Sequence, residues 1–187
     1  MLYGRSFSEV VISAQADGVA NTAGTAASAI PASAKFTLPA NVLSIGSVIK
    51  IEACGKMSSV ITTPGTMRFD VRFGAILVFD SLAVLLDTAA GHTNVGWLLE
   101  IMLTCRAIGA TTSANFMGHG RLTCEAIKGQ GTAMPVGGVV ANLPWNSTPA
   151  VGTGFDSTIS NVVDLFFTQT VATGSMTLQQ YALTLLN

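Results

Sequence analysis

The sequence predicts an all-β protein built as an antiparallel β-sandwich. The first observation is residues 66–73 (TMRFDVRF), where apolar and polar side chains alternate as they do in a strand with one buried face. The same period of two recurs in residues 49–53 and 97–106. The second observation is that short segments rich in Gly, Pro, Ser and Thr separate these stretches, with no convincing amphipathic helix between them.

The N-terminal part of the chain is a segment of small side chains. Between residues 13 and 34 nearly every residue is Ala, Ser, Thr, Gly or Asn, Asp17 is the only charge, and no apolar period is sustained. Such a segment buries too little apolar surface to become ordered by itself. Small residues can nevertheless lie flat against a second chain at little cost in side-chain entropy. We therefore expect residues 1–40 to be an arm, either poorly ordered or held on a partner, and residues 41–187 to be one sandwich domain.

Eight strands are expected after the arm. They are residues 46–57, 66–73, 75–79, 82–87, 96–108, 115–128, 160–170 and 176–186. Thr63-Pro64-Gly65 contains a tight-turn dipeptide, and residues 109–113 form a short polar hairpin loop. In the last strand two alternating sets of residues qualify as inward-facing, which indicates a bulge at Gln179-Gln180. Eight strands joined by short turns predict a jelly-roll-like sandwich.

The longest irregular segment is residues 129–156, which is rich in Gly and Pro. A loop of this length in a small domain usually serves a function, often as a contact surface. It contains Leu143, Pro144 and Trp145, and Trp is enriched at protein interfaces. We predict that these three residues contact a partner; the alternative is that Trp145 caps its own sandwich.

The composition favours self-association. Of the 187 residues 49% are hydrophobic and only 10% are charged, which is too little charge to coat the surface of a solitary chain. The net charge of -1 and the dispersed Lys and Arg residues give no footprint for nucleic acid. The apolar runs end well before the ~18 residues that a membrane-spanning helix needs. We therefore expect a homo-oligomer that has neither nucleic acid nor a membrane as its partner.

The three cysteines are predicted to be free. Cys54, Cys105 and Cys124 are odd in number and form no C-x-x-C pair, so they indicate buried thiols and a reducing site of synthesis. Ala14-Gln15-Ala16 imitates a signal-peptidase site, but only a short apolar stretch precedes it and Glu9 adjoins that stretch. A secretory signal is therefore not expected.

No residue pattern predicts catalysis. Three G-x-G tripeptides occur, yet none continues into a phosphate-binding motif, and no G-x-S-x-G elbow is present. Gly118 and Gly120 fall on an inward face, where the missing side chains let bulky neighbours approach. His92 falls in a loop and His119 on an outward face, and a single strand histidine is usually a surface residue, although three copies of His119 at a trimer axis would be able to bind a metal ion. We predict no enzyme activity, no cofactor and no metal site, and we keep His119 as a candidate interface residue.

Arg68, Asp70 and Arg72 form the notable charge cluster, on the outward face of one predicted strand. Alternating charges on such a face are most simply a solvated surface, which contributes little to stability. The functional interpretation is a ladder of salt bridges between subunits. Both interpretations stay open, and the three residues are candidate interface residues.

Several stretches resemble small jelly-roll virion proteins of tailed bacteriophages. They are Phe36-Thr37-Leu38-Pro39, Gly46-Ser47-Val48-Ile49-Lys50-Ile51, Met67-Arg68-Phe69, Trp97-Leu98-Leu99-Glu100 and Leu178-Gln179-Gln180-Tyr181-Ala182-Leu183. The resemblance runs from about residue 35 to the end of the sequence and is one of texture: Gly-, Thr- and Ser-rich strands, a Trp-x-x-Glu strand after an Asn/Gly loop, and a closing Leu-rich strand.

The resemblance implies a structural role on a virus particle. Proteins of this group are typically trimers that decorate or cement a capsid, so we expect a trimer on the capsid surface, made in the host cytoplasm, with the major capsid protein as its partner. The alternative is a receptor- or glycan-binding head of a tail or fibre, because jelly rolls also occur in lectins. Trp145 with Asn142 and Asn146 approximates the aromatic and amide groups of a sugar site.

Overall fold

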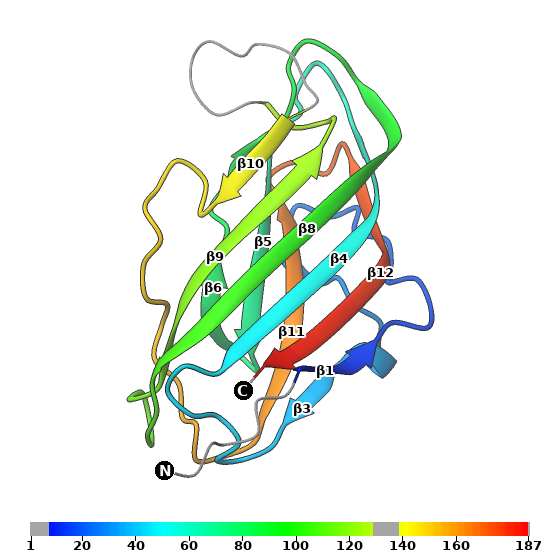
Figure 1. The fold of residues 1–187 in the computed structure, drawn as a ribbon. Coiled ribbons are helices and arrows are strands. Elements are labelled where there is room, and N and C mark those ends of the chain that lie inside the picture. Colours follow the sequence, from blue (N-terminus) through cyan, green and yellow to red (C-terminus); the bar gives the residue numbers. More distant parts are fainter. Residues whose placement is uncertain (1–7, 129–138, 187) are drawn as a thin grey trace.

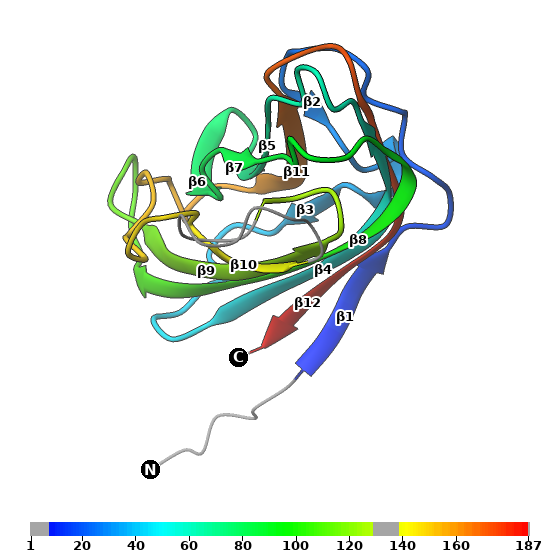
Figure 2. The ribbon, with the colours of Figure 1, turned by 90° about the horizontal axis from the view of Figure 1, so that it is seen from above.

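Two antiparallel sheets packed face to face make up the computed structural model, which describes residues 8–128 and 139–186. Sheet A faces the viewer in Figure 1 with sheet B behind it, and Figure 2 shows the two layers from above. In spatial order sheet A contains β1 (Ser8–Ser13), β12 (Ser175–Leu186), β4 (Val48–Ser59), β8 (His92–Ala107), β9 (Asn115–Cys124) and β10 (Val139–Leu143). Sheet B contains β2 (Ala27–Ser28), β11 (Asn161–Gln169), β5 (Thr66–Phe73) and β6 (Ile76–Asp80), with β3 (Phe36–Leu38) also paired to β11 and β7 (Val84–Leu85) to β5.

The strands pair in the nested order of a jelly roll. Taken along the chain as β1, β2, β4, β5, β6, β8, β11 and β12, the first pairs with the last, β2 with β11, β4 with β8, and β5 with β6. This nesting folds one long antiparallel ribbon into two sheets. Strands β9 and β10 then extend sheet A beyond β8. The predicted all-β, jelly-roll-like sandwich is confirmed.

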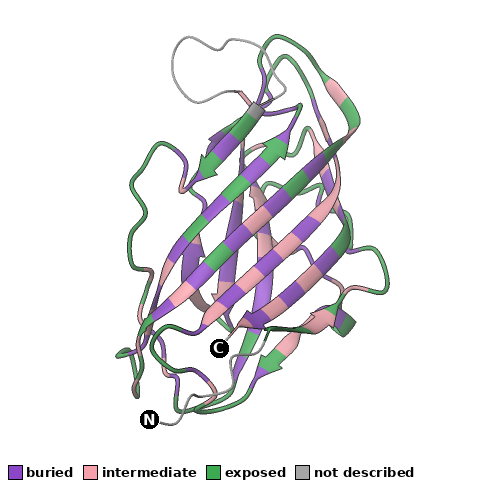
Figure 3. Ribbon diagram, in the orientation of Figure 1, coloured by how far each residue is buried: buried purple, intermediate pink, exposed green. Residues whose placement is uncertain are grey.

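The hydrophobic core lies between the sheets. Buried residues alternate with more exposed ones along β4, β8 and β9, as Figure 3 shows. The ring of Phe73 lies 5.5 Å from that of Phe116 and 4.8 Å from that of Phe155, and the last two rings stack 5.0 Å apart. Offset and edge-on aromatic pairs of this kind stabilise a core beyond the area that they bury. The three rings therefore fasten β5, β9 and the segment before β11 to one another.

Several strand boundaries follow the sequence pattern closely, but two predicted strands are shorter than expected. Strand β5 spans the predicted residues 66–73, and the pairing of β12 with β4 shifts register between Leu178 and Gln180, where the bulge is predicted. The strand predicted over residues 82–87 shrinks to β7. Leu82 has a φ of 58°, a left-handed conformation that no regular strand accommodates. The predicted strand over residues 115–128 ends at Cys124.

The described part of the N-terminal arm, from residue 8 onward, is packed on its own sandwich, which corrects the expectation for this part that it is poorly ordered or held by a partner. Strand β1 pairs with β12 at the edge of sheet A, Asn21 bridges to Met176, and β2 pairs with β11 of sheet B. Ala29, Ile30 and Ala34, around the 3-10 turn η1 (Ala32–Ala34), are buried in the core. The described part of the arm, from residue 8 onward, therefore crosses from one sheet to the other and closes that side of the sandwich (Figure 2).

Most of the described part of the predicted contact loop also belongs to the sandwich. Residues 129–138 lie outside the described residues, but residues 139–143 form β10 along the upper half of β9. Val151 bridges to Met117 and Phe155 to Ala114, so the same segment completes the free edge of β9 farther down. In the part of the chain that the structure describes, no helix reaches the length and hydropathy of a membrane span.

Candidate functional site

Sheet A presents a broad outer face, which is the candidate functional site. The strand register sets its outward side chains in rows that run across the sheet. The first row is Gln180, Cys54, Leu98, Thr123 and Val140; the second is Ala182, Glu52, Glu100, Arg121 and Asn142; the third is Thr184, Lys50, Met102 and His119. The first row is uncharged, the second carries two acids and one base, and the third carries Lys50 and a titratable histidine.

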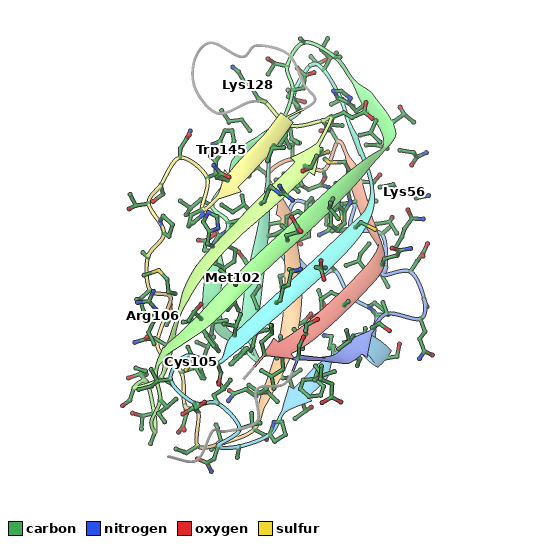
Figure 4. The ribbon with its side chains drawn as sticks, viewed as in Figure 1. Lys56, Met102, Cys105, Arg106, Lys128 and Trp145 are labelled. Carbon is green, nitrogen blue, oxygen red and sulfur yellow. The ribbon has the colours of Figure 1, made fainter. Side chains whose placement is uncertain are left out.

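Apolar side chains stand exposed in the middle of this face. Leu98 is 44% exposed and Met102, labelled in Figure 4, is 51% exposed; both lie on β8, four residues apart. Val140 on β10 is similarly exposed. Single exposed apolar residues are ordinary, and here Glu100 lies between Leu98 and Met102, so the exposed apolar residues are spread over a face that also carries charges.

The charges of this face are paired with one another and lie near water. The Lys50 ammonium donates to Glu52 Oε1 over 2.9 Å, and Arg121 Nε donates to Glu100 Oε2 over 2.9 Å. The side chains of both pairs are about a third to a half exposed, so each pair contributes little to stability. Glu52 and Glu100 lie directly opposite each other in the register, and their repulsion offsets part of that contribution.

Three open hollows indent the face between the projecting side chains. One of about 380 Å³ lies beside Cys54 and Leu98, one of about 320 Å³ beside Met102 and His119, and one of about 420 Å³ between Leu98 and Thr123. The hollows alternate with the projections of Leu98 and Met102. Open hollows of this kind can receive the side chains of another protein. A small molecule usually needs a deeper pocket, which buries most of the surface of the molecule.

The outer face of sheet B carries the predicted charge cluster, in a different arrangement. Asp70 is only 2% exposed, with Arg68 Nε 2.9 Å from Oδ1 and an Arg72 nitrogen donating to Oδ2 over 2.8 Å. Arg68 also donates two hydrogen bonds of 2.7 Å to Asp80, and the Arg72 guanidinium lies 4.0 Å above the ring of Phe166. The cluster is therefore a network within the chain that encloses a buried carboxylate, and the description of a freely solvated face does not hold for Asp70.

A second carboxylate of sheet B is enclosed by the arm. Asp164, opposite Arg72 in the register, is buried; the Lys35 ammonium lies 2.6 Å from Oδ2 and the Ser28 hydroxyl donates to Oδ1 over 2.7 Å. Both partners belong to the N-terminal arm. The arm thus supplies a charge and a hydroxyl group that hold the outer face of sheet B together.

The predicted loop contacts lie mostly inside the sandwich. Trp145, beside the end of β10 in Figure 4, is 5% exposed, Leu143 is buried and Pro144 is half-buried. The Trp145 amide donates to the Ser81 carbonyl over 2.7 Å, which ties this segment to the chain after β6. The alternative prediction for Trp145, that it caps its own sandwich, fits this burial, which argues against Trp145 and Leu143 as exposed anchors.

The sugar site outlined from the sequence is not assembled. Trp145 is buried, although Asn142 lies in the second row of the outer face of sheet A and Asn146 is exposed. Among the described residues no Trp, Tyr or Phe side chain is exposed; Phe36 and Phe166 are half-buried. The described chain thus offers no exposed aromatic platform on which a sugar ring would stack.

The two histidines differ from each other in their surroundings. His119 is exposed in the third row beside Met102, as its outward position predicts. His92 begins β8, and its Nε2 lies 3.1 Å from Asp87 Oδ2, a pairing that the sequence did not predict because Asp87 belongs to the segment after β7. Within the described ranges no group of three or more His, Cys, Asp or Glu side chains is placed to hold a metal ion.

Asp87 is ionised and held by specific hydrogen bonds. Burial raises the pKa of its carboxyl, but the Ala89 amide, which donates to Oδ1 over 2.8 Å, and His92 outweigh the burial, so the net pKa is lowered. The Asp87 amide also donates to the Ala126 carbonyl over 2.9 Å. The pair therefore joins the chain after β7 of sheet B to the start of β8 in sheet A.

Cys105 and Cys124 are buried as predicted, whereas Cys54 is only half-buried on the outer face of sheet A, because its position alternates with that of the inward Ala53. Cys54, Cys105 and Cys124 are free; burial raises the pKa of the Cys105 thiol and raises that of Cys124 to about 11, so both stay protonated and unreactive. Gly118 and Gly120 face inward as predicted. A Cβ on Gly118 would lie 2.2 Å from Phe79 Cδ2. Gly118 therefore leaves room for a bulky ring, which confirms the packing interpretation of this G-x-G tripeptide.

Comparison with known proteins adds little to this geometry. No protein-family model and no curated protein matches the chain. A solved structure of the CBM2 module of the evolved Dit of Lactobacillus casei BL23 phage J-1 aligns with 78% of this chain and 68% of that one, at 8% identity and a TM-score of 0.20. A similarity at that TM-score carries no argument about function.

Proposed function

We propose that this chain is a non-enzymatic structural protein of a bacteriophage virion, which associates with copies of itself and decorates or cements the capsid through its major capsid protein. The observation that carries the proposal is the outer face of sheet A, where Leu98, Met102 and Val140 stand exposed between weak ion pairs. A jelly roll is common among viral structural proteins, and the sequence resembles that group. The trimer implied by the resemblance is the expected stoichiometry.

The proposal is tested first by the mass of the purified chain. Size-exclusion chromatography with light scattering should give a multiple of 19.3 kDa. A tagged chain produced during infection by the encoding phage should then co-purify with assembled capsids, and particles lacking it should break open at a lower temperature. A monomer at all concentrations that is absent from purified particles would refute the proposal.

A receptor- or glycan-binding head is the alternative function. Jelly rolls also serve as lectins, but the aromatic residue expected at such a site, Trp145, is buried. Binding of the purified chain to a glycan array, together with its absence from capsids and its presence on tails, would favour this alternative.

A further inference from the structure

We propose that a second copy of this chain covers the outer face of sheet A, through a contact in which the same face of both copies meets across a two-fold axis lying along β8. The proposal rests on the proposed self-association and specifies the surface. A two-fold contact doubles whatever unit it joins, so a single chain becomes a dimer and a trimer becomes a hexamer.

The face has the size that a specific interface needs. Its six strands, at ~4.8 Å between strands and ~3.4 Å per residue for about ten residues, give about 24 by 34 Å. Each copy therefore offers roughly 800 Å², and two copies would bury roughly 1,600 Å², the standard size for a stable protein contact. The exposed side chains of Leu98 and Met102 would lie in the middle of that area.

The distribution of charge favours an identical partner. In the second row the β4 side carries Glu52 and the β9 side carries Arg121, with Glu100 between them on β8. Rotation by 180° about an axis along β8 places β4 of one copy opposite β9 of the partner copy. Each row of one copy then lies opposite the same row of the partner copy. Glu52 of one copy then faces Arg121 of the partner copy, and the two equivalent pairs flank Glu100, which lies on the axis opposite Glu100 of the partner copy. A strongly charged partner would leave one of the two signs unmatched.

The same rotation brings the apolar projections together. Leu98 and Met102 lie on β8, so each meets its own counterpart at the axis. The neighbouring hollows, on either side of Leu98, give these side chains room to interdigitate. The apolar contacts of Leu98 and Met102 would thus lie on either side of the charged second row, near the middle of the interface, where apolar contacts are usual.

The outer face of sheet B differs in how its charges are paired. Its arginines and aspartates form ion pairs within the chain, as do Lys35 and Asp164. Two exposed apolar residues of this face are Leu85 and Val162, and Val162 is 39% accessible, close to the value for Leu98. Leu98→Glu and Val162→Glu thus place the same charge at positions of similar exposure on opposite faces.

The first experiment compares these two variants with the wild type by light scattering over a range of concentrations. We expect Leu98→Glu to halve the mass of the assembly and Val162→Glu to leave it unchanged, with both variants folded by circular dichroism. An unchanged mass for Leu98→Glu would overturn the proposed contact. A fall to one third would also overturn it, because sheet A would then take part in a ring rather than a two-fold pair.

A charge exchange tests the facing pair itself. Glu52→Arg and Arg121→Glu should each raise the dissociation constant about tenfold or more, because each sets like charges against one another across the axis. The double variant should recover most of the affinity, since position 52 and position 121 of the partner copy are again opposite in sign and Glu100 regains a basic neighbour in its own chain. Additive losses in the double variant would refute the axis along β8.

These outcomes separate the contact from the proposed function. A wild-type chain that stays monomeric and is absent from particles defeats both. If the wild type is an oligomer and no substitution on the outer face of sheet A changes its mass, the proposed contact is wrong, but self-association is still supported.

Discussion

The two outer faces of this sandwich use charge in opposite ways. On sheet B, Asp70 is enclosed by Arg68 and Arg72, and Asp164 is enclosed by residues of the arm. On sheet A, the pairs Lys50–Glu52 and Arg121–Glu100 lie in water beside exposed apolar side chains. A similar supply of charged residues therefore stabilises the fold on one face and leaves the other face free to meet a partner.

The two faces differ because the side chains that pair with the acids come from different parts of the fold. Asp70 and Asp164 draw their bases and hydroxyl groups from neighbouring strands and from the arm, so burial of these carboxylates is offset by several contacts. The acids Glu52 and Glu100 of sheet A each have one basic partner that is about half exposed. Exposed pairs of that kind are screened by salt and yield easily to rearrangement when another surface arrives.

The largest effect is expected from Asp70→Ala. The change leaves Arg72 without its carboxylate and Arg68 with Asp80 alone, on a face where the carboxylate was almost fully buried. We expect a loss of about 3 kcal/mol in the free energy of unfolding, at the low end for a broken buried pair because both arginines are partly exposed. Urea unfolding at fixed protein concentration measures it.

Glu52→Ala is the matched control for this comparison, because it removes one carboxylate from an exposed pair on the other face. It should change the unfolding free energy by less than about 1 kcal/mol. Equal losses for the two variants would erase the distinction between the faces.

A smaller, pH-dependent effect is expected at the link between the sheets, from Asp87→Asn. The lowered pKa of Asp87 means that its contribution is present above the unfolded value of ~3.9 and is lost as the pH falls through the lower folded value. At neutral pH the variant should lose about 2 kcal/mol through the weakened bonds to Ala89 and His92. Unfolding measured from neutral to acid pH should show the wild type and the variant converging below about pH 4; a constant difference would contradict the ionised Asp87.

The fold was predictable where the two faces of a strand differ in polarity. Residues 66–73 alternate because one face meets the core, and the bulge near Gln180 could be recognised because two inward sets compete in one strand. The arm could not be predicted in the same way. Its small residues carry no period, and the bond from Asn21 to the Phe167 carbonyl joins positions 146 residues apart.

The functional surface was only partly predictable. The sequence singled out Arg68, Asp70 and Arg72, but Asp80, which completes that network, comes from another strand. Trp145 was predicted to lie at an interface because Trp is enriched there. Its burial depends instead on the strand pairing around it, which residue type does not reveal. Leu98 and Met102 lie in the strand predicted over residues 96–108, but the sequence did not single them out, and their alignment with Glu52 and Arg121 depends on register, which residue type alone does not specify.

The smallest effect is expected from Glu100→Gln, at the centre of the open face. The substitution removes the exposed pair with Arg121, which by itself contributes a few tenths of a kcal/mol, and it also removes the repulsion from Glu52 directly opposite. The two changes oppose each other, so the unfolding free energy of the dilute chain should shift by less than about 0.5 kcal/mol and should not depend on salt. Chemical unfolding at low and high ionic strength checks this. A loss as large as that of Asp70→Ala would mean that sheet A, like sheet B, uses its surface charges to hold the fold, and that its outer face is not free for a partner.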